Sequence, residues 1–266
     1  MSRLNSSLFS KLARVGYASK SCVYFTLGGM SLIAGFNRGD KPADSVEALR
    51  TIFEQSHGKF LLGALIISIF CYVLWRLGQA FLDLEHKGNH KKGIAIRAIY
   101  FLSAVAYGAV GTAACRMLLG MSHSQGGDAA AQSVTATLMA QPLGRILVVV
   151  LGLAFLAAGI VQAVIGYKQK FSEQLDFRSL SQKTRKGLCR VCSFGFYARG
   201  VVFALMGAFF IWATLEASSQ EAHGFAGTLL VVRQQPYGPW LLAIVAAGLV
   251  AYGLYCLVQV FYRRKR

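Results

Sequence analysis

The sequence predicts an all-α membrane protein in which six transmembrane helices form three tandem two-helix repeats with pseudo-threefold symmetry. Three observations lead to this prediction. Only 15% of the 266 residues are charged while 55% are hydrophobic, six long apolar stretches divide the chain, and one glycine–aromatic motif recurs in it. Soluble domains carry about 25% charged residues, so too few charges remain here to cover a surface that faces water.

Each apolar stretch is close to the ~20 residues with which a helix crosses the hydrocarbon core of a bilayer. Strands of a membrane barrel would instead appear as alternating segments of about 10 residues, and the sequence contains no such pattern. The six stretches lie at residues 16–36, 60–82, 97–119, 145–167, 194–215 and 239–262.

The recurring motif combines a glycine, an aromatic residue and a basic residue at the start of alternate spans. It is clear in the first and third repeats and weaker in the second. Because each repeat crosses the membrane twice, all three have the same orientation, and such repeats are related by an axis along the membrane normal. The three copies are Gly16-Tyr17 with Lys20, Ile99-Tyr100 with Ser103, and Gly195-Phe196 with Arg199.

The predicted organisation begins with a basic cytoplasmic leader at residues 1–14 and ends with a basic tail at 263–266. The repeats lie between them, at 15–86, 97–172 and 190–262. The leader is expected to lie on the membrane surface, and the first span is expected to remain as an anchor because no cleavage site follows it. The inner connections are hydrophilic and basic, and no firm structure is predicted for them.

An amphipathic helix is expected in the outer connection of each repeat. In the first, Val46, Leu49 and Ile52 follow helical spacing, with Glu47 and Arg50 on the opposite face. Weaker equivalents lie at 129–140 and 225–233. The three connections end alike, on a glycine that admits a sharp turn into the next span. These glycines are Gly58, Gly144 and Gly238.

Small residues recur at seven-residue spacing in the spans, in one stripe on the odd-numbered helices and another on the even-numbered ones. Small side chains let helix backbones approach closely within lipid, where no hydrophobic force drives association. The stripes are therefore predicted to be packing seams. The predicted helix-packing residues are Ser21, Gly28, Gly35, Gly111, Gly152, Gly159, Gly200 and Gly207.

The distribution of the net charge of +17 argues against nucleic acid as a partner. Of the 28 Lys and Arg residues, 20 lie in or beside the N-terminal segment, the second and fourth connections and the C-terminal tail, and 7 lie in the other three connections. The positive-inside bias therefore predicts that both termini are cytoplasmic. The expected partners are membrane lipids, through anionic headgroups at the cytoplasmic face.

Five polar residues near the inner ends of the spans are the candidate ligand or lipid-headgroup site. Lys20 and Arg199 share one position of the repeat, and Arg76 lies at a similar depth. Ionisable residues within a membrane are functional candidates, but long basic side chains also extend to the headgroups with their stems in lipid, and this second interpretation is favoured. Ser103, at the same repeat position, argues against a symmetric ring of cations. The candidates are Lys20, Arg76, Gln162, Arg199 and Gln259.

No catalytic residue, metal site or cofactor is predicted. Cys189 and Cys192 form a lone C-x-x-C that could act in redox chemistry, but a zinc site would need two further ligands. His57, His123 and His223 fall one in each outer loop and are expected to be exposed loop histidines. The middle of every span lacks an acidic residue, which disfavours proton-coupled transport.

The glycine–aromatic–basic motif, the later Tyr252-Gly253 pair and the Gln259-x-Phe261 ending resemble a bacterial family known as domain of unknown function 1206. The resemblance covers nearly the whole chain, although Ile99 and Ser103 depart from the pattern. It implies six spans in the bacterial inner membrane and three two-helix units. It supplies no activity.

Three functions remain open on this basis. The leading hypothesis is a non-enzymatic structural or accessory component of the membrane, because small-residue seams and amphipathic outer segments dominate the sequence. The alternative is a transporter or channel with a small-molecule or lipid site near the pseudo-threefold axis. A thiol or metal enzyme that uses Cys189 and Cys192 is the third.

Overall fold

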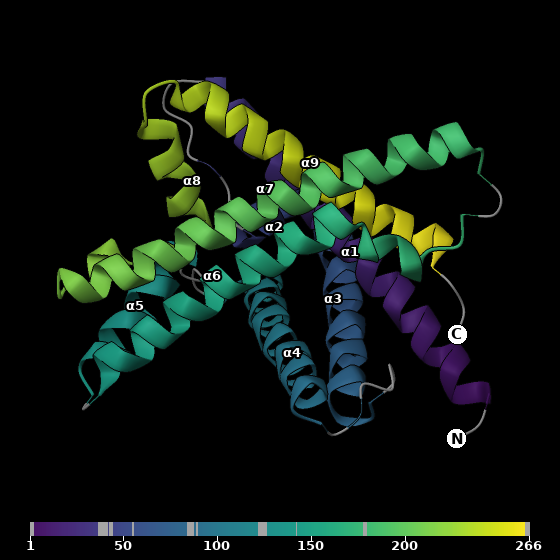
Figure 1. Ribbon diagram of the computed structural model, residues 1–266, viewed down its shortest axis with the longest axis horizontal. Coiled ribbons are helices and arrows are strands. Elements are labelled where there is room, and N and C mark those ends of the chain that lie inside the picture. Colours follow the sequence, from purple (N-terminus) through teal and green to yellow (C-terminus); the bar gives the residue numbers. More distant parts are fainter. Residues whose placement is uncertain are drawn as a thin grey trace. The chain divides into compact units, whose positions relative to one another are not determined.

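The computed structural model describes residues 3–36, 42, 45–54, 56–83, 88, 90–121, 127–141, 143–177 and 180–263. Within these ranges the regular elements are all helices (Figure 1). The predicted all-α class is therefore confirmed.

Six long helices coincide with the six apolar stretches. Five of them, all but α1, are long and apolar enough to cross a membrane, and α1 contains the apolar stretch 16–36. Large apolar side chains such as Phe60, Ile160 and Phe261 are exposed along them, as contact with lipid requires. The six are α1 (Arg3–Phe36), α3 (Gly58–Phe81), α4 (Lys91–Leu118), α6 (Gly144–Lys168), α7 (Gln182–Leu215) and α9 (Gly238–Tyr262).

Three shorter helices occupy the predicted outer connections: α2 (Ser45–Phe53), α5 (Gly127–Met139) and α8 (Phe225–Gln234). The amphipathic character of α2 is confirmed, because Leu49 is fully buried and Ile52 nearly so, while Glu47 and Arg50 are exposed. Two 3₁₀ turns, η1 (Lys170–Gln174) and η2 (Ser219–Glu221), complete the described elements.

Three helices, α1, α4 and α7, begin earlier than the apolar stretches suggest. The predicted leader is continuous with the first span, since α1 runs without a break from Arg3. The helix α7 begins at Gln182, inside the inner connection for which no structure is predicted. Ser181 caps it, because the Ser181 side chain accepts a hydrogen bond from the backbone N–H of Thr184 at 3.2 Å. Lys and Arg are good helix formers, so a basic segment next to a span extends the helix.

The second spans of the three repeats, α3, α6 and α9, begin at equivalent glycines. A Cβ atom at Gly58, Gly144 or Gly238 would collide with a backbone carbonyl oxygen in the last turn of the preceding short helix. These glycines therefore align the repeats, and they make Tyr72, Ala158 and Tyr252 equivalent. The same register makes Arg76, Gln162 and Cys256 equivalent.

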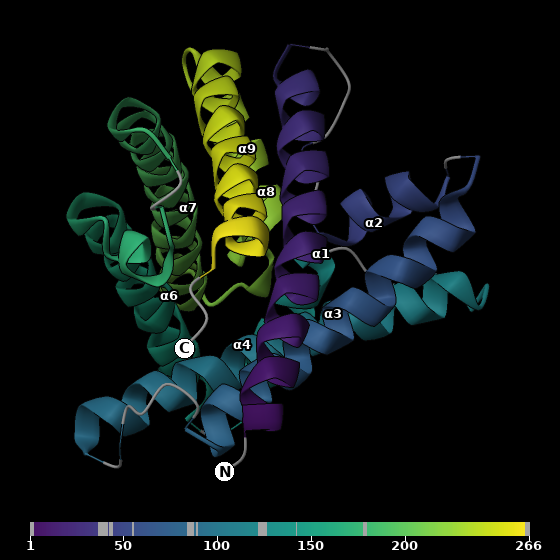
Figure 2. The same ribbon diagram turned by 90° about the vertical axis from the view of Figure 1, so that its right-hand side faces the viewer.

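The chain divides into two compact units. The first consists of Met1–Cys22, Leu49–Ser124 and Cys256–Arg266, and the second of Val23–Ala48 and Gln125–Tyr255. In the first unit α3 and α4 lie side by side, and a Cβ at Gly111 would lie 3.2 Å from Ile69 and 3.4 Å from Phe70. In the second unit α6 and α7 lie side by side as an antiparallel pair (Figures 1 and 2).

The α6–α7 interface is a seam of glycines from both predicted stripes. A Cβ at Gly152 would lie 2.8 Å from the carbonyl oxygen of Gly207, and one at Gly159 would lie 2.7 Å from that of Gly200. About two turns beyond the Gly159–Gly200 pair, the Ser193 hydroxyl donates a hydrogen bond of 2.9 Å to the carbonyl of Gly166. Backbone meets backbone along this seam, as small-residue packing in lipid permits.

The same contact recurs between α1 and α9 within the second unit. A Cβ at Gly28 would lie 2.9 Å from the backbone N of Val250 and 3.0 Å from the carbonyl oxygen of Ala246. Gly28 is equivalent to Gly207, and Ala246 to Gly152. Gly35 lies further along α1, where a Cβ would be 3.3 Å from the carbonyl oxygen of Pro239, and Ser21 is buried. The first span of a repeat thus packs on the second span of the preceding repeat: α4 packs on α3 and α7 packs on α6. In the same way, α1 packs on α9.

Candidate functional site

The first unit holds a cluster of cations around one tyrosine of α3. The Tyr72 hydroxyl accepts a hydrogen bond from Lys20 Nζ at 3.2 Å and another from Arg76 Nε at 2.7 Å. Arg76 also donates from Nη1 to the Gln79 amide oxygen at 3.0 Å. Two of the five predicted site residues, Lys20 and Arg76, therefore meet at a residue that was not predicted.

Aromatic rings enclose these two cations. Lys20 Nζ lies 4.8 Å from the ring centroids of both Tyr72 and Tyr107, and the guanidinium of Arg76 lies 5.1 Å from those of Tyr72 and Tyr100. Ring faces attract cations. Lys20 is only 4% exposed, so it is held among tyrosines and does not extend to the headgroups as an isolated side chain would.

A glycine makes room for Tyr72. A Cβ at Gly16 would collide with the Tyr72 Cβ and lie 2.7 Å from its Cα. This close approach brings Tyr17 edge-on to Tyr72, with ring centroids 5.7 Å apart. The Gly-aromatic-x-x-basic motif thus encodes a contact: the glycine admits the tyrosine, the aromatic packs on it and the basic residue donates to it.

Arg263 belongs to the same group of residues. Its guanidinium lies 5.4 Å from the Tyr17 ring and 4.8 Å from the Trp75 ring. Sequence analysis had placed Arg263 only in a basic tail. Gln259, one turn earlier on α9, is fully buried.

The second unit holds a corresponding cluster around Arg199. The Arg199 Nη1 donates a hydrogen bond of 2.6 Å to the Tyr252 hydroxyl. Its guanidinium lies 4.6 Å from the ring centroid of Tyr252, 4.7 Å from that of Phe203 and 5.6 Å from that of Tyr24. A Cβ at Gly195 would again collide with the tyrosine backbone, here that of Tyr252.

The two clusters match position by position. In each, the cation and the hydrogen-bonding tyrosine come from one repeat, and a further tyrosine comes from the first span of another repeat. That span is α4 of the second repeat in the first cluster and α1 of the first repeat in the second cluster. The edge-on rings correspond as well, at 4.9 Å for Tyr72 with Tyr107 and 4.7 Å for Tyr252 with Tyr24. The second repeat carries neither polar partner. The equivalent sets are Lys20, Tyr72 and Tyr107 in the first cluster, Arg199, Tyr252 and Tyr24 in the second, and Ser103, Ala158 and Phe203 for the second repeat.

Gln162 takes no part in a described cation cluster. A Cβ added at Gly200 would lie 3.5 Å from the Gln162 Cβ, so Gln162 borders the α6–α7 seam. The glutamine occupies the repeat position of Arg76, but the tyrosine that Arg76 binds is replaced by Ala158 in this repeat.

The cysteine and histidine candidates are scattered. Cys189 and Cys192 are buried in α7 and are not joined in a disulfide. Within the described ranges no three His, Cys, Asp or Glu side chains gather as metal ligands would. His57 is exposed, His223 packs edge-on against Phe209, and His123 lies outside the described residues.

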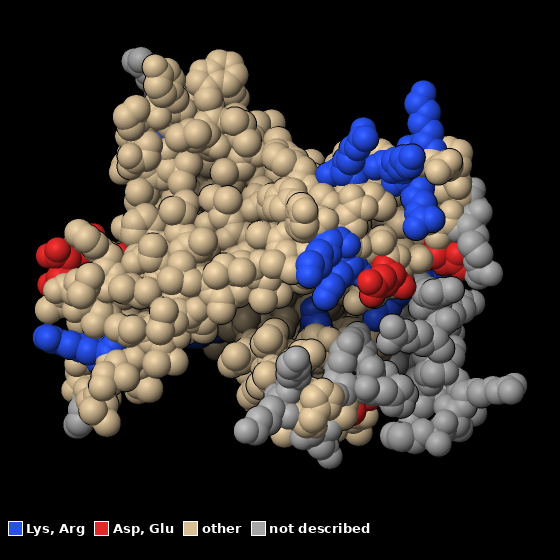
Figure 3. All heavy atoms as spheres, in the orientation of Figure 1, with Lys and Arg blue, Asp and Glu red and all other residues tan. Residues whose placement is uncertain are grey.

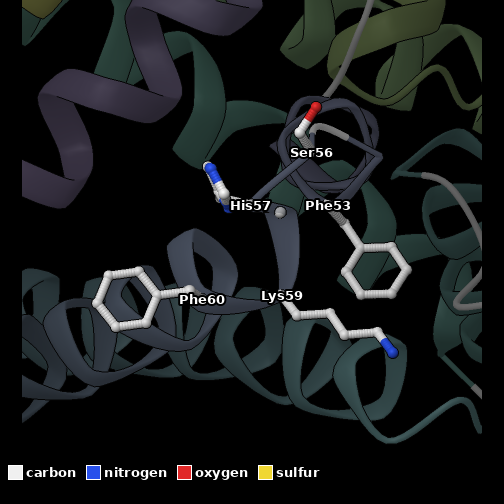
Figure 4. Close-up of a pocket in the computed structure, with 6 residues that line it drawn as sticks. Phe53, Ser56, His57, Lys59 and Phe60 are labelled. Carbon is white, nitrogen blue, oxygen red and sulfur yellow. The ribbon is translucent and has the colours of Figure 1, made fainter.

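A hollow of about 400 Å³ lies where α2 meets α3, lined by Phe53, Ser56, His57, Gly58, Lys59 and Phe60 (Figure 4). It is open to the surroundings, and Lys59 and Phe60 point to opposite sides of it. None of the five predicted site residues lines it.

The surface charge of the second unit follows the expected asymmetry. In Figure 3 basic side chains gather over the first turns of α7, and the rest of α6 and α7 on that face is largely uncharged. The sequence places Lys183, Arg185, Lys186 and Arg190 in those turns.

These features define the class: a multi-pass helical membrane protein of three tandem two-helix repeats with cations buried among aromatic rings. The chain belongs to the family described as Domain of Unknown Function (DUF1206), whose model matches residues 15–83, 98–169 and 194–263. The resemblance and the three-repeat architecture predicted from sequence are confirmed. The chain is 29% identical to the uncharacterized protein YxxB of Bacillus subtilis (strain 168) over 253 residues, which are 95% of this chain and 90% of that relative. No solved structure matches it.

Proposed function

We propose that this protein is a non-enzymatic structural or accessory component of the bacterial inner membrane. The observation that carries the proposal is the enclosure of Lys20 and Arg199. Each is surrounded by aromatic rings and donates a hydrogen bond to a tyrosine of another helix. Cations so placed join helices together, and they are not presented to a substrate.

The energies involved support this role. A central charge in a membrane helix costs about 2.5–3.5 kcal/mol by insertion scales, and less near the interface. A desolvated cation–π contact contributes about 2 kcal/mol, and a hydrogen bond that involves a charged group about 1.5–3 kcal/mol. The hydrogen bond and three ring contacts of Arg199 therefore offset much of the cost of its burial.

The competing function is a transporter or channel, which needs water to reach the polar residues of the spans. Hydroxyl-radical footprinting of the intact protein in lipid nanodiscs separates the two functions, because only aromatic rings that water reaches are oxidised. Tyr72 and Tyr252, at 0% and 4% exposure, should stay unmodified, while Tyr237, at 80%, serves as the oxidised control. Oxidation of Tyr72 and Tyr252 at the rate of Tyr237 would refute the structural role and favour transport.

The cytoplasmic location of both termini is part of the proposal, and the anionic headgroups of the inner leaflet are the proposed partners. The basic first turns of α7 support it, since cytoplasmic segments carry the excess of Lys and Arg. A fluorescent protein that folds only in the cytoplasm, fused after Arg266, should fluoresce in bacterial cells. An alkaline phosphatase fused there should be inactive, and an active one would reverse the proposed orientation.

A further inference from the structure

Two guanidinium groups at the inner end of the first unit have nitrogen atoms that the described residues leave unsatisfied. Arg14 Nε and Arg263 Nη1 are buried and have no hydrogen-bond partner among the residues that the structure describes. A buried N–H without an acceptor is costly, and such groups in folded proteins normally find a partner. An acceptor from outside the described residues, such as a bound anion, would satisfy both nitrogens.

Arg263 contacts the Tyr17 ring, and Arg14 lies on the same face of α1 as Tyr17. The guanidinium of Arg263 lies 5.4 Å from the centroid of Tyr17. Arg14 precedes Tyr17 by three residues on α1, and residues at that spacing are neighbours on one face of a helix. The Tyr17 ring also faces Lys20, whose Nζ lies 5.9 Å from its centroid. Lys20 and Arg263, which directly follows α9, therefore flank the Tyr17 ring, and Arg14 lies three residues before it on α1.

The spans themselves contribute only positive charge to this place. The six apolar stretches contain no Asp or Glu, so the ionised groups that α1, α3 and α9 bring here from within the spans are Lys and Arg. Like charges held close together repel one another, and a bound anion would reverse that cost. Guanidinium groups bind phosphate through paired hydrogen bonds and charge.

We propose that Arg14 and Arg263 bind a phosphate group beside Tyr17, supplied by an anionic phospholipid headgroup or by a free phosphate. The phosphate oxygens accept hydrogen bonds from Arg14 Nε and Arg263 Nη1, and Lys20 adds to the local positive potential. Trp75, whose ring lies 4.8 Å from the Arg263 guanidinium, holds that group in place. This site gives the proposed headgroup partners one place to bind, and it does not depend on the structural role proposed for Lys20 and Arg199.

The test measures thermal unfolding of the full-length protein in mild detergent during titration with a phosphate-bearing probe. The probes are phosphatidylglycerol, phosphatidylcholine and inorganic phosphate. For wild type we expect phosphatidylglycerol to raise the unfolding midpoint more than phosphatidylcholine does. In Arg14→Gln and in Arg263→Gln, the phosphatidylglycerol concentration that gives half of the effect should rise about tenfold or more, because each variant loses a charged hydrogen bond. Arg145→Gln, an exposed arginine at the start of α6, is the matched control and should not change it.

The outcomes separate the two sources of phosphate. A wild-type shift with phosphatidylglycerol alone, reduced in both variants, assigns the site to a lipid headgroup. A shift with inorganic phosphate that both variants lose assigns it to free phosphate. Equal stabilisation of wild type by phosphatidylglycerol and phosphatidylcholine with no shift from inorganic phosphate, or titration curves in both variants that match wild type, overturns the site.

Native mass spectrometry of the wild-type protein provides a test without substitutions, should either variant fail to fold. Wild type released from detergent should retain phosphatidylglycerol or phosphate in preference to phosphatidylcholine. Loss of every phosphate-bearing adduct under conditions that keep the protein folded would also overturn the proposal. Neither negative result bears on the enclosure of Lys20 and Arg199, so the proposed structural role would stand.

Discussion

Gly16 and Tyr72 approach so closely that no side chain fits between them: a Cβ on Gly16 would lie 2.7 Å from the Tyr72 Cα. Gly195 and Tyr252 repeat this relationship at the same distance. In the second repeat, the residue equivalent to the glycine is Ile99 and the residue equivalent to the tyrosine is Ala158. Within this one chain, a tyrosine in the second span of a repeat therefore occurs where the first span of that repeat carries a glycine.

Replacing either glycine by alanine should loosen the cluster that it helps to build. In Gly16→Ala and Gly195→Ala the new methyl group meets backbone atoms of the facing tyrosine, which cannot move without separating the helices. Overpacking of this kind costs about 1–3 kcal/mol, so the midpoint of thermal unfolding in detergent should fall in both variants.

Gly29→Ala is the matched control on the same helix, because a Cβ at Gly29 has nothing within 4 Å. It should be neutral or slightly stabilising, since alanine is the better helix former. Combining Gly16→Ala with Tyr72→Gly, which removes the Tyr72 Cβ and ring that the new methyl group would meet, should give a smaller loss than the sum of the single losses. Strict additivity would show that the two residues do not interact.

The α6–α7 seam should be equally intolerant of added methyl groups. In Gly207→Ala the Cβ would lie 2.6 Å from the carbonyl oxygen of Gly152 and 2.8 Å from the backbone N of Leu156. We expect a loss of about 1–3 kcal/mol for Gly207→Ala and for Gly159→Ala, measured by unfolding in detergent. Gly187→Ala, at an open position of α7, should lose nothing. A Gly207→Ala protein as stable as the Gly187→Ala protein would mean that the helices do not touch along this line.

Much of this architecture follows from sequence, because length, apolarity and repetition are properties that each segment carries by itself. The six spans, the short helices at Ser45–Phe53 and Phe225–Gln234, and the family all belong here. The early starts of α1 and α7 were not predicted. A basic, polar segment carries no apolar signal, and only its connection to a span made it helical.

The partners of the cations could not be read from sequence in the same way. In the sequence, Tyr72 looks like an ordinary aromatic of an apolar span and Tyr252 stands out only in the Tyr-Gly pair of the family resemblance. The role of both depends on which helix faces them. One signal was available. When α3, α6 and α9 are aligned on Gly58, Gly144 and Gly238, these two tyrosines occupy the same repeat position. Arg263, in contrast, gave no such signal, because the same register pairs it with Asp83 and Gln169, which are not basic.

Arg199 and Tyr252 should contribute to stability as a pair. The hydrogen bond between them is 2.6 Å long and involves a charged donor, so Tyr252→Phe should cost about 1.5–3 kcal/mol. Arg199→Met should cost at least as much, because it also removes the three cation–ring contacts. Arg199→Lys should be milder, since the first repeat carries Lys20 at this position.

A double-mutant cycle on detergent-purified protein measures the coupling between Arg199 and Tyr252. The coupling should exceed about 1 kcal/mol, because the two groups are in direct contact. Arg185, an exposed residue whose guanidinium lies 5.9 Å from the Phe177 ring, is the control. Arg185→Met should change stability by less than about 0.5 kcal/mol. A coupling near zero for Arg199 and Tyr252 would remove the main argument for a structural cation.

Arg97 should hold the inner ends of α3 and α4 together. Its Nε donates to the carbonyl of Ala80 at 2.7 Å and its Nη2 to that of Phe81 at 3.1 Å. These are among the last carbonyls of α3, which have no partner within that helix. Arg97→Gln should therefore accelerate amide exchange at the C-terminal turn of α3, while Arg116→Gln, an exposed arginine at the other end of α4, should not. Unchanged exchange in Arg97→Gln would show that solvent or lipid satisfies these carbonyls equally well.

Asp128 should organise the outer connections of the second and third repeats. Its Oδ1 accepts a hydrogen bond of 2.6 Å from the backbone N–H of Gly224, the residue that caps α8, and a Cβ on Gly227 would collide with its carboxylate. A carboxylate at a helix N-terminus satisfies free N–H groups and the positive end of the dipole. Asp128→Ala should therefore speed amide exchange of the first turn of α8, measured by mass spectrometry.

The size of that effect should distinguish a carboxylate cap from simple packing. Loss of an N-terminal cap costs about 1 kcal/mol, which corresponds to exchange roughly five times faster if the first turn opens locally. Asp128→Asn keeps an acceptor of the same shape and should lie between wild type and Asp128→Ala. Glu216→Gln, at an exposed site after α7, should leave exchange in α8 unchanged. If Asp128→Ala exchanged as slowly as wild type while Glu216→Gln exchanged faster, the cap assigned to Asp128 would be wrong.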